Sequence, residues 1–127
     1  MSTSKPEVVR GLLITPGDTV ATLRLIAVGA PVGISGVLDG AMIQALDLDG
    51  ESVLWIDESG KSKGLATNLL ATKIAHRLHA GLYPDDTING PALILGESVA
   101  PSGELTSVDL TAATLEALRM VGVEVLE

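Results

Sequence analysis

The chain has 127 residues, of which 46% are hydrophobic, and this is enough for one domain with a packed core. It has no cysteine, which excludes disulfides, thiolate zinc sites and cysteine nucleophiles. The net charge of −8 and the near absence of aromatic residues argue against direct nucleic-acid binding, because phosphates need Lys and Arg and bases stack on aromatic rings.

Residues 1–6 are polar, and we expect a disordered tail in front of a single α+β domain that spans residues 7–127. The N-terminal segment lacks the apolar core of a secretory signal. The longest apolar run is far shorter than the roughly 20 residues that cross a bilayer. We therefore expect a cytoplasmic protein that has no membrane partner.

Strand patterns separated by turn residues fill the first half of the chain. Apolar and β-branched residues predict strands over residues 7–14, 19–28, 41–48 and 52–57. Residues 15–18 predict the first turn, because Pro16 fixes φ and Gly17 accepts a positive φ.

Two further segments complete this half. Asp49-Gly50 predicts a type I′ hairpin turn between the third and fourth strands. Glycine and proline recur between residues 29 and 40, which favours no more than a short helical turn near residues 34–38.

A helix is predicted after the loop at residues 59–64. Thr67 is the expected N-cap and Gly81 the expected end. The stripe predicted to be buried is Leu70, Ala71, Ile74, Ala75 and Leu78. A second, polar face holds Asn68, Thr72, His76 and His79.

The remaining residues predict a short buried strand within 91–96, a loop over 97–106 and a helix over about 109–121. Ser107 or Asp109 is the expected cap of this helix, and Gly122 its end. Its apolar stripe is expected at Leu110, Ala113, Ala117, Met120 and Val121.

Together these elements predict an α+β fold: a mixed, mainly antiparallel sheet of five or six strands, with two helices packed on one face. Val123 and Val125 predict an additional edge strand, which leaves a homodimer open.

Charge is distributed unevenly along the chain. No acidic residue lies between Glu58 and Asp85, so this segment carries a formal charge of +4 and the rest of the chain −12. Its basic loop leads into a helix N-terminus, where free N–H groups and the helix dipole favour anions. The predicted binding residues are Lys61, Lys63, Asn68, Thr72, Lys73, His76 and Arg77. The alternative is an ordinary solvated helix.

Three motifs that suggest chemistry fail on spacing. Gly60-Lys61-Ser62 resembles a phosphate loop, but Trp55 stands where that motif needs its first glycine. His76 and His79 supply two imidazoles where a stable metal site needs three or four ligands. Gly33-Ile34-Ser35-Gly36 lacks the spacing of a serine nucleophile elbow. We therefore expect no cofactor and no metal.

The order of several short motifs resembles one family. These motifs are Leu13-Ile14-Thr15-Pro16-Gly17, Asp57-Glu58-Ser59-Gly60-Lys61, Gly64-Leu65-Ala66-Thr67-Asn68, Ala71-Thr72 and Ile88-Asn89-Gly90. Over roughly residues 12–108 the chain resembles small domains of unknown function from actinobacteria, their phages and mobile elements. Residues 29–40 depart from that pattern, where the family has a helix rich in Gln and Leu. The resemblance implies a mobile-element setting, in which non-enzymatic proteins that bind host factors are common.

We therefore expect a non-catalytic, phage-type accessory or interaction protein. It would bind a host protein or a small anionic ligand through residues 59–79. One alternative is a small-molecule enzyme that uses Asp57 or Glu58 with His76 or His79. Another is an acidic inhibitor that mimics DNA, which fits the net charge, although the acids are spread along the chain.

Overall fold

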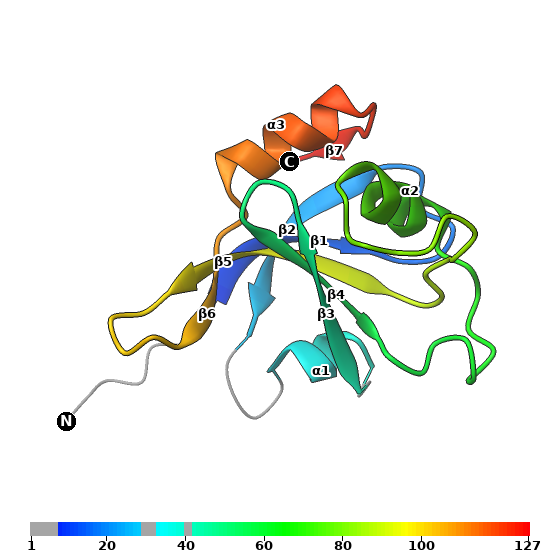
Figure 1. Ribbon diagram of the computed structural model, residues 1–127, viewed down its shortest axis with the longest axis horizontal. Helices are drawn as coiled ribbons and strands as arrows, with labels where there is room; N and C mark the ends of the chain where they lie inside the picture. The colour runs from blue at the N-terminus through cyan, green and yellow to red at the C-terminus, as the bar shows by residue number, and fades with distance from the viewer. Residues whose placement is uncertain (1–7, 29–32, 40–41) are drawn as a thin grey trace.

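The computed structural model describes residues 8–28, 33–39 and 42–127; the tail predicted at 1–6 lies outside these ranges. Figure 1 shows a curled sheet with helices on both sides. The strands are β1 Val8–Ile14, β2 Ala21–Ala27, β3 Ile43–Leu48, β4 Ser52–Asp57, β5 Ala92–Val99, β6 Leu105–Val108 and β7 Val125–Leu126. The helices are α1 Gly33–Val37, α2 Leu69–Arg77 and α3 Ala112–Met120.

The strands pair in the order β3-β4-β5-β1-β2-β7, and β6 pairs with β5 beside this path. All pairs are antiparallel except β2 with β7. The predicted α+β class with a mixed, mainly antiparallel sheet is confirmed. The sheet has seven strands instead of five or six, and there are three short helices instead of two.

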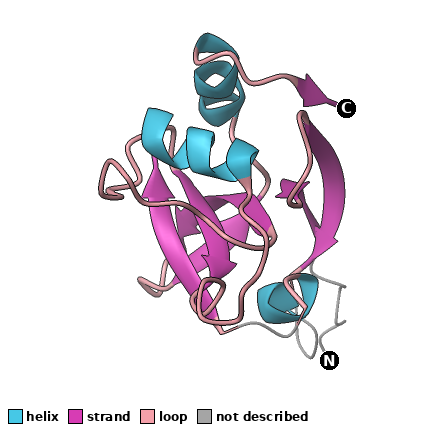
Figure 2. Cartoon of the chain, turned by 90° about the vertical axis from the view of Figure 1, so that its right-hand side faces the viewer, coloured by secondary structure: helices cyan, strands magenta, loops and turns pink. Residues whose placement is uncertain are grey.

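Both faces of the sheet carry a core, because alternate residues of a strand point to opposite faces. In β5, Ile94 packs in the larger cluster with α2 and α3, whereas Leu93 and Leu95 pack in the smaller cluster with α1. The two predicted helices therefore share one face, and α1 covers the other (Figure 2). The helical turn expected near residues 34–38 is α1.

The first hairpin turn is confirmed, since the Asp18 amide donates to the Thr15 carbonyl at 3.0 Å. The second hairpin is also present, but its turn is not type I′. Leu48 pairs with Ser52, so the loop holds three residues, and positive φ angles fall at Gly50 and Glu51. The Asp49 amide donates to the Leu78 carbonyl, which is a contact that local sequence does not reveal.

Helix α2 buries the predicted stripe, but both of its predicted ends are wrong. Asn68, not Thr67, is the N-cap, because its Oδ1 accepts from the Ala71 amide at 3.0 Å. The helix ends at Arg77, and His79 takes the positive φ that the sequence assigned to Gly81 as the stop signal.

The loop predicted at residues 97–106 is also wrong. Strand β5 continues to Val99, and β6 returns beside it as a two-stranded ribbon. The Ala100 amide closes the turn by donating to the Glu104 carbonyl at 2.8 Å. Polar residues in this ribbon concealed the strand pattern, because both faces of the ribbon are largely exposed.

Helix α3 is capped by Thr111 instead of Ser107 or Asp109. The carboxylate of Asp109 accepts from the Arg10 amide at 2.8 Å instead. The buried residues of the helix are Thr114 and Leu118, whereas Met120 is 79% exposed, so the predicted stripe was out of phase. The helix stops at Gly122 as predicted, and β7 forms the expected edge strand.

Candidate functional site

Two of the four predicted cations are held by carboxylates. Lys61 pairs with Asp86, and Nζ of Lys63 lies 2.8 Å from Oδ2 of Asp57. Asp57 is only 5% exposed, and the hydrogen bond from Lys63 lowers its pKa, helped by the Ser59 amide. The carboxyl groups that bound the acid-free segment in sequence therefore fold back onto its first two lysines.

Lys73 and Arg77 have different partners. Their side chains contact backbone carbonyls just after α3: Lys73 Nζ lies 3.3 Å from Gly122 O, and Arg77 Nη1 lies 3.4 Å from Val121 O. Within residues 8–28, 33–39 and 42–127, neither forms an ion pair. Residues four apart share a helix face, so the two cations stand together on α2.

Asn68 is fully buried and uses its whole amide group inside the fold. Its Nδ2 donates to the carbonyls of Ile14 and Gly90, both at 2.9 Å, while its Oδ1 caps α2. Thr72 lies one turn further along. Its hydroxyl donates to the Asn68 carbonyl and accepts from the Ile88 amide. Both side chains therefore join α2 to the segment that precedes β5.

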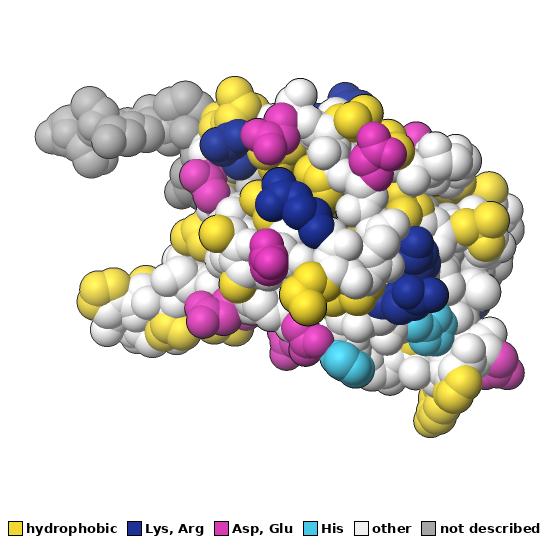
Figure 3. Space-filling view, turned by 90° about the horizontal axis from the view of Figure 1, so that it is seen from above, with side chains coloured by type: hydrophobic (Ala, Val, Ile, Leu, Met, Phe, Trp, Pro, Cys, Tyr) yellow, Lys and Arg dark blue, Asp and Glu magenta, His cyan; other side chains and the backbone are white. Residues whose placement is uncertain are grey.

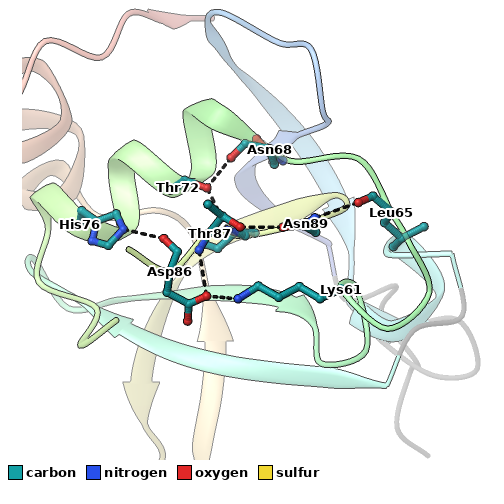
Figure 4. A network of polar contacts seen from close by, with 9 residues as sticks. Lys61, Leu65, Asn68, Thr72, His76, Asp86, Thr87 and Asn89 are labelled. Atoms are coloured by element: carbon teal, nitrogen blue, oxygen red, sulfur yellow. Dashed lines mark hydrogen bonds and ion pairs between the residues drawn. The ribbon is translucent and has the colours of Figure 1, made fainter. Parts of the chain in front are cut away.

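His76 belongs to the same polar network, which Figure 4 shows. Its Nε2 lies 2.9 Å from the Asp86 carbonyl and must donate, because a carbonyl oxygen only accepts. The network continues from the Thr87 hydroxyl to the Asn89 side chain, and from there to the Leu65 carbonyl. These contacts hold residues 83–90 between α2 and the loop that carries Lys61.

The carboxylates and histidines of the enzyme alternative line different hollows. Asp57 and Glu58 line a pocket of about 150 Å³, together with Lys61 and Asp86. His76 and His79 line a separate depression at the end of α2. His79 is occupied by Asp49, with 2.5 Å between Nδ1 and Oδ2.

No group of three or more His, Asp or Glu in the described segments lies close enough to hold a metal ion.

Two exposed apolar side chains, which the sequence reading did not assign to the site, flank the cations. Leu69 is 75% exposed and lies one helical turn before Lys73. Met120 is 79% exposed and directly precedes the carbonyl that Arg77 contacts. Figure 3 shows the side of the molecule above α2 and α3, where hydrophobic and cationic side chains lie among each other. Leu69 falls outside the buried stripe of α2, and this was the available sequence signal. We call Leu69, Lys73, Arg77 and Met120 the α2–α3 face.

No protein-family model, curated protein or solved structure matches the chain in the three comparisons made. None of the helices in the described ranges combines the length and apolar character that crossing a bilayer requires. The family resemblance stays a prediction, and a functional argument has to come from the site.

Proposed function

We propose that this protein is a non-catalytic binding protein whose α2–α3 face docks on an acidic surface of a partner protein. In the mobile-element setting that the family resemblance implies, this partner is a host protein. The proposal narrows the predicted segment 59–79 to its helical part, because Lys61 and Lys63 are paired with carboxylates.

The observation that carries the proposal is the state of Lys73 and Arg77. Both are cations on a chain with a net charge of −8, and their described contacts are long hydrogen bonds to carbonyls. Such long contacts are weak, so exchanging them for a partner's carboxylates costs little. A local positive surface on an acidic body also orients an approaching acidic partner.

The surroundings of the two cations favour a protein over a small ligand. Met and Arg are enriched in protein interfaces, and the α2–α3 face has one of each, both exposed. Beside it, an open hollow of about 450 Å³ lies between α2 and the β1–β2 turn, lined partly by Leu69, Leu70 and Lys73. This hollow offers room for an apolar side chain of the partner.

Affinity capture from an actinobacterial lysate tests the proposal. The full chain is compared with the variant Lys73→Glu/Arg77→Glu and with the control Arg10→Glu/Arg24→Glu. The control makes the same change of charge at two exposed positions on β1 and β2. Fluorescence of the single tryptophan, Trp55, verifies that all three proteins are folded.

We expect the wild-type chain and the control to retain the same acidic protein. The α2–α3 variant should lose at least tenfold in affinity for it, because each cation would be replaced by a repelling charge. Capture by the variant at wild-type affinity would contradict the proposal. NMR titrations with ATP and with inorganic phosphate cover the small-ligand alternative, which saturable shifts at Lys73 and Arg77 without any captured protein would favour.

A further inference from the structure

A second hollow lies far from α2, between the β5–β6 ribbon and the β3–β4 turn. Its volume is about 410 Å³. We call it the ribbon groove, and it is lined by Asp47, Leu48, Glu51, Ser52, Glu97, Ser98, Val99 and Leu105. Figure 1 shows the ribbon projecting beyond the body of the sheet on the side opposite α2.

Strand β5 has an open edge in this groove. On its β4 side, the pairing register ends where Ser52 faces Gly96, and the Glu97 amide then donates to the Glu51 carbonyl at 3.2 Å. Beyond that point, Ser98 and Val99 pair only with β6 among the described strands. An exposed strand edge presents backbone groups that can pair with another chain.

The ribbon adds apolar surface to that edge. Val99 and Leu105 are register partners on β5 and β6, so their side chains lie on one face of the ribbon. They are 64% and 65% exposed. Two adjacent aliphatic side chains at this exposure gain stability from an apolar cover.

The groove is also negatively charged. Asp47, Glu51 and Glu97 line it, and no Lys or Arg is among its lining residues. In the part of the chain that the structure describes, none of these three carboxylates forms an ion pair. The complement of this surface is a chain that carries both positive charge and aliphatic side chains.

We propose that the ribbon groove binds an extended, basic segment of a partner protein, added as a strand beside the distal part of β5. Successive side chains of a strand point to opposite sides. A segment that alternates Lys or Arg with aliphatic residues would therefore direct one set toward the carboxylates and the other toward Val99 and Leu105. This site uses different residues from the α2–α3 face and does not depend on it.

The test uses the full ¹⁵N-labelled chain and a blocked ten-residue peptide that alternates Lys and Val. We expect saturable NMR shifts centred on the amides of Glu51, Ser98 and Val99. A Lys–Ser peptide of the same charge should bind more weakly, because it lacks the aliphatic set.

Matched variants separate the groove from general attraction to an acidic protein. Glu51→Gln/Glu97→Gln removes two charges from the groove, and Asp85→Asn/Glu116→Gln removes two exposed charges elsewhere. We expect the groove variant to weaken Lys–Val binding by roughly fivefold or more, since each exposed ion pair contributes a few-fold in affinity. The control should change it by less than about twofold.

Three results would overturn the proposal: equal weakening by both variants, shifts centred outside the groove, or equal binding of the Lys–Val and Lys–Ser peptides. Shifts of the same amides with protein concentration in the absence of peptide would identify a second copy of the chain as the occupant. That result would also overturn the assignment to a basic partner.

Discussion

Asn68 joins three parts of the chain with one side chain. Its amide caps α2 and donates to the carbonyls of Ile14 in β1 and Gly90 before β5. The sequence marked this residue as polar, helical and available for binding. Its burial depends on strands 54 and 22 residues away in the chain, which local pattern cannot reveal.

Replacing Asn68 by alanine should therefore destabilise the fold strongly. Loss of a cap costs about 1 kcal/mol, and each buried carbonyl left without a donor costs roughly another 1–3 kcal/mol. We expect a loss of about 3 kcal/mol or more in the free energy of unfolding, measured by urea denaturation with Trp55 fluorescence. The control is Thr67→Ala, at the exposed position that the sequence favoured as cap. A larger loss for Thr67→Ala would contradict the assignment of Asn68 as the cap.

The pair Asp57 and Lys63 makes stability depend on pH in acid. Lys63 lowers the pKa of the Asp57 carboxyl below its ordinary value of 3.8, so the folded state favours the ionised form. This contribution is complete above pH 3.8 and is lost as the pH falls through the lower folded pKa. Asp57→Asn should be less stable than wild type at neutral pH, and the gap should narrow below pH 3.8.

Urea denaturation at a series of pH values measures this gap. Lys63→Met is the matched variant, because it removes the cause of the lowered pKa and leaves the carboxyl in place. Its gap from wild type should narrow over the same pH window. A gap that stays constant into acid for both variants would show that the ion pair does not set the pKa.

At the scale of elements, the sequence predicted the strands that are buried or paired on both sides. β1 and β4 were found with nearly their observed bounds, because their apolar runs are dense. The β5–β6 ribbon was missed because exposure on both faces removes the alternation that marks a strand. The phase of α3 was also missed, since a buried Thr114 is tolerated only because Ser52 and the Gly50 carbonyl bond its hydroxyl.

The phase of α3 predicts opposite effects for two apolar residues of one helix. Leu118 is fully buried, so Leu118→Ala should cost about 2–5 kcal/mol of unfolding free energy. Met120 is 79% exposed, so Met120→Ala should change it by no more than about 0.5 kcal/mol. Thermal and urea denaturation measure both. Similar losses for the two variants would support the stripe that the sequence predicted.

At the scale of the whole molecule, the sequence located the acid-free segment but not its neutralisation. Lys61 finds its partner at Asp86, 25 residues along the chain, and only the fold brings the two together. The four cations therefore separate into a paired set on the loop and an unpaired set on α2. Linear charge pattern predicts which segment is basic, whereas the tertiary fold decides which of its charges stay available.

The surplus of negative charge predicts how salt affects stability. The chain has 16 acidic and 8 basic residues, and three ion pairs join side chains in its described part. Raising NaCl from about 0.01 M to 1 M shortens the screening length from about 30 Å to 3 Å, which weakens repulsion among the unpaired carboxylates more than these few attractions. We expect the Tm to rise by roughly 4 °C, equivalent to about 1 kcal/mol, in thermal denaturation followed by circular dichroism. Asp85→Asn/Glu116→Gln should show a smaller rise, because it begins with less repulsion. A Tm that falls with added salt would mean that the ion pairs contribute more to stability than the surplus charge removes.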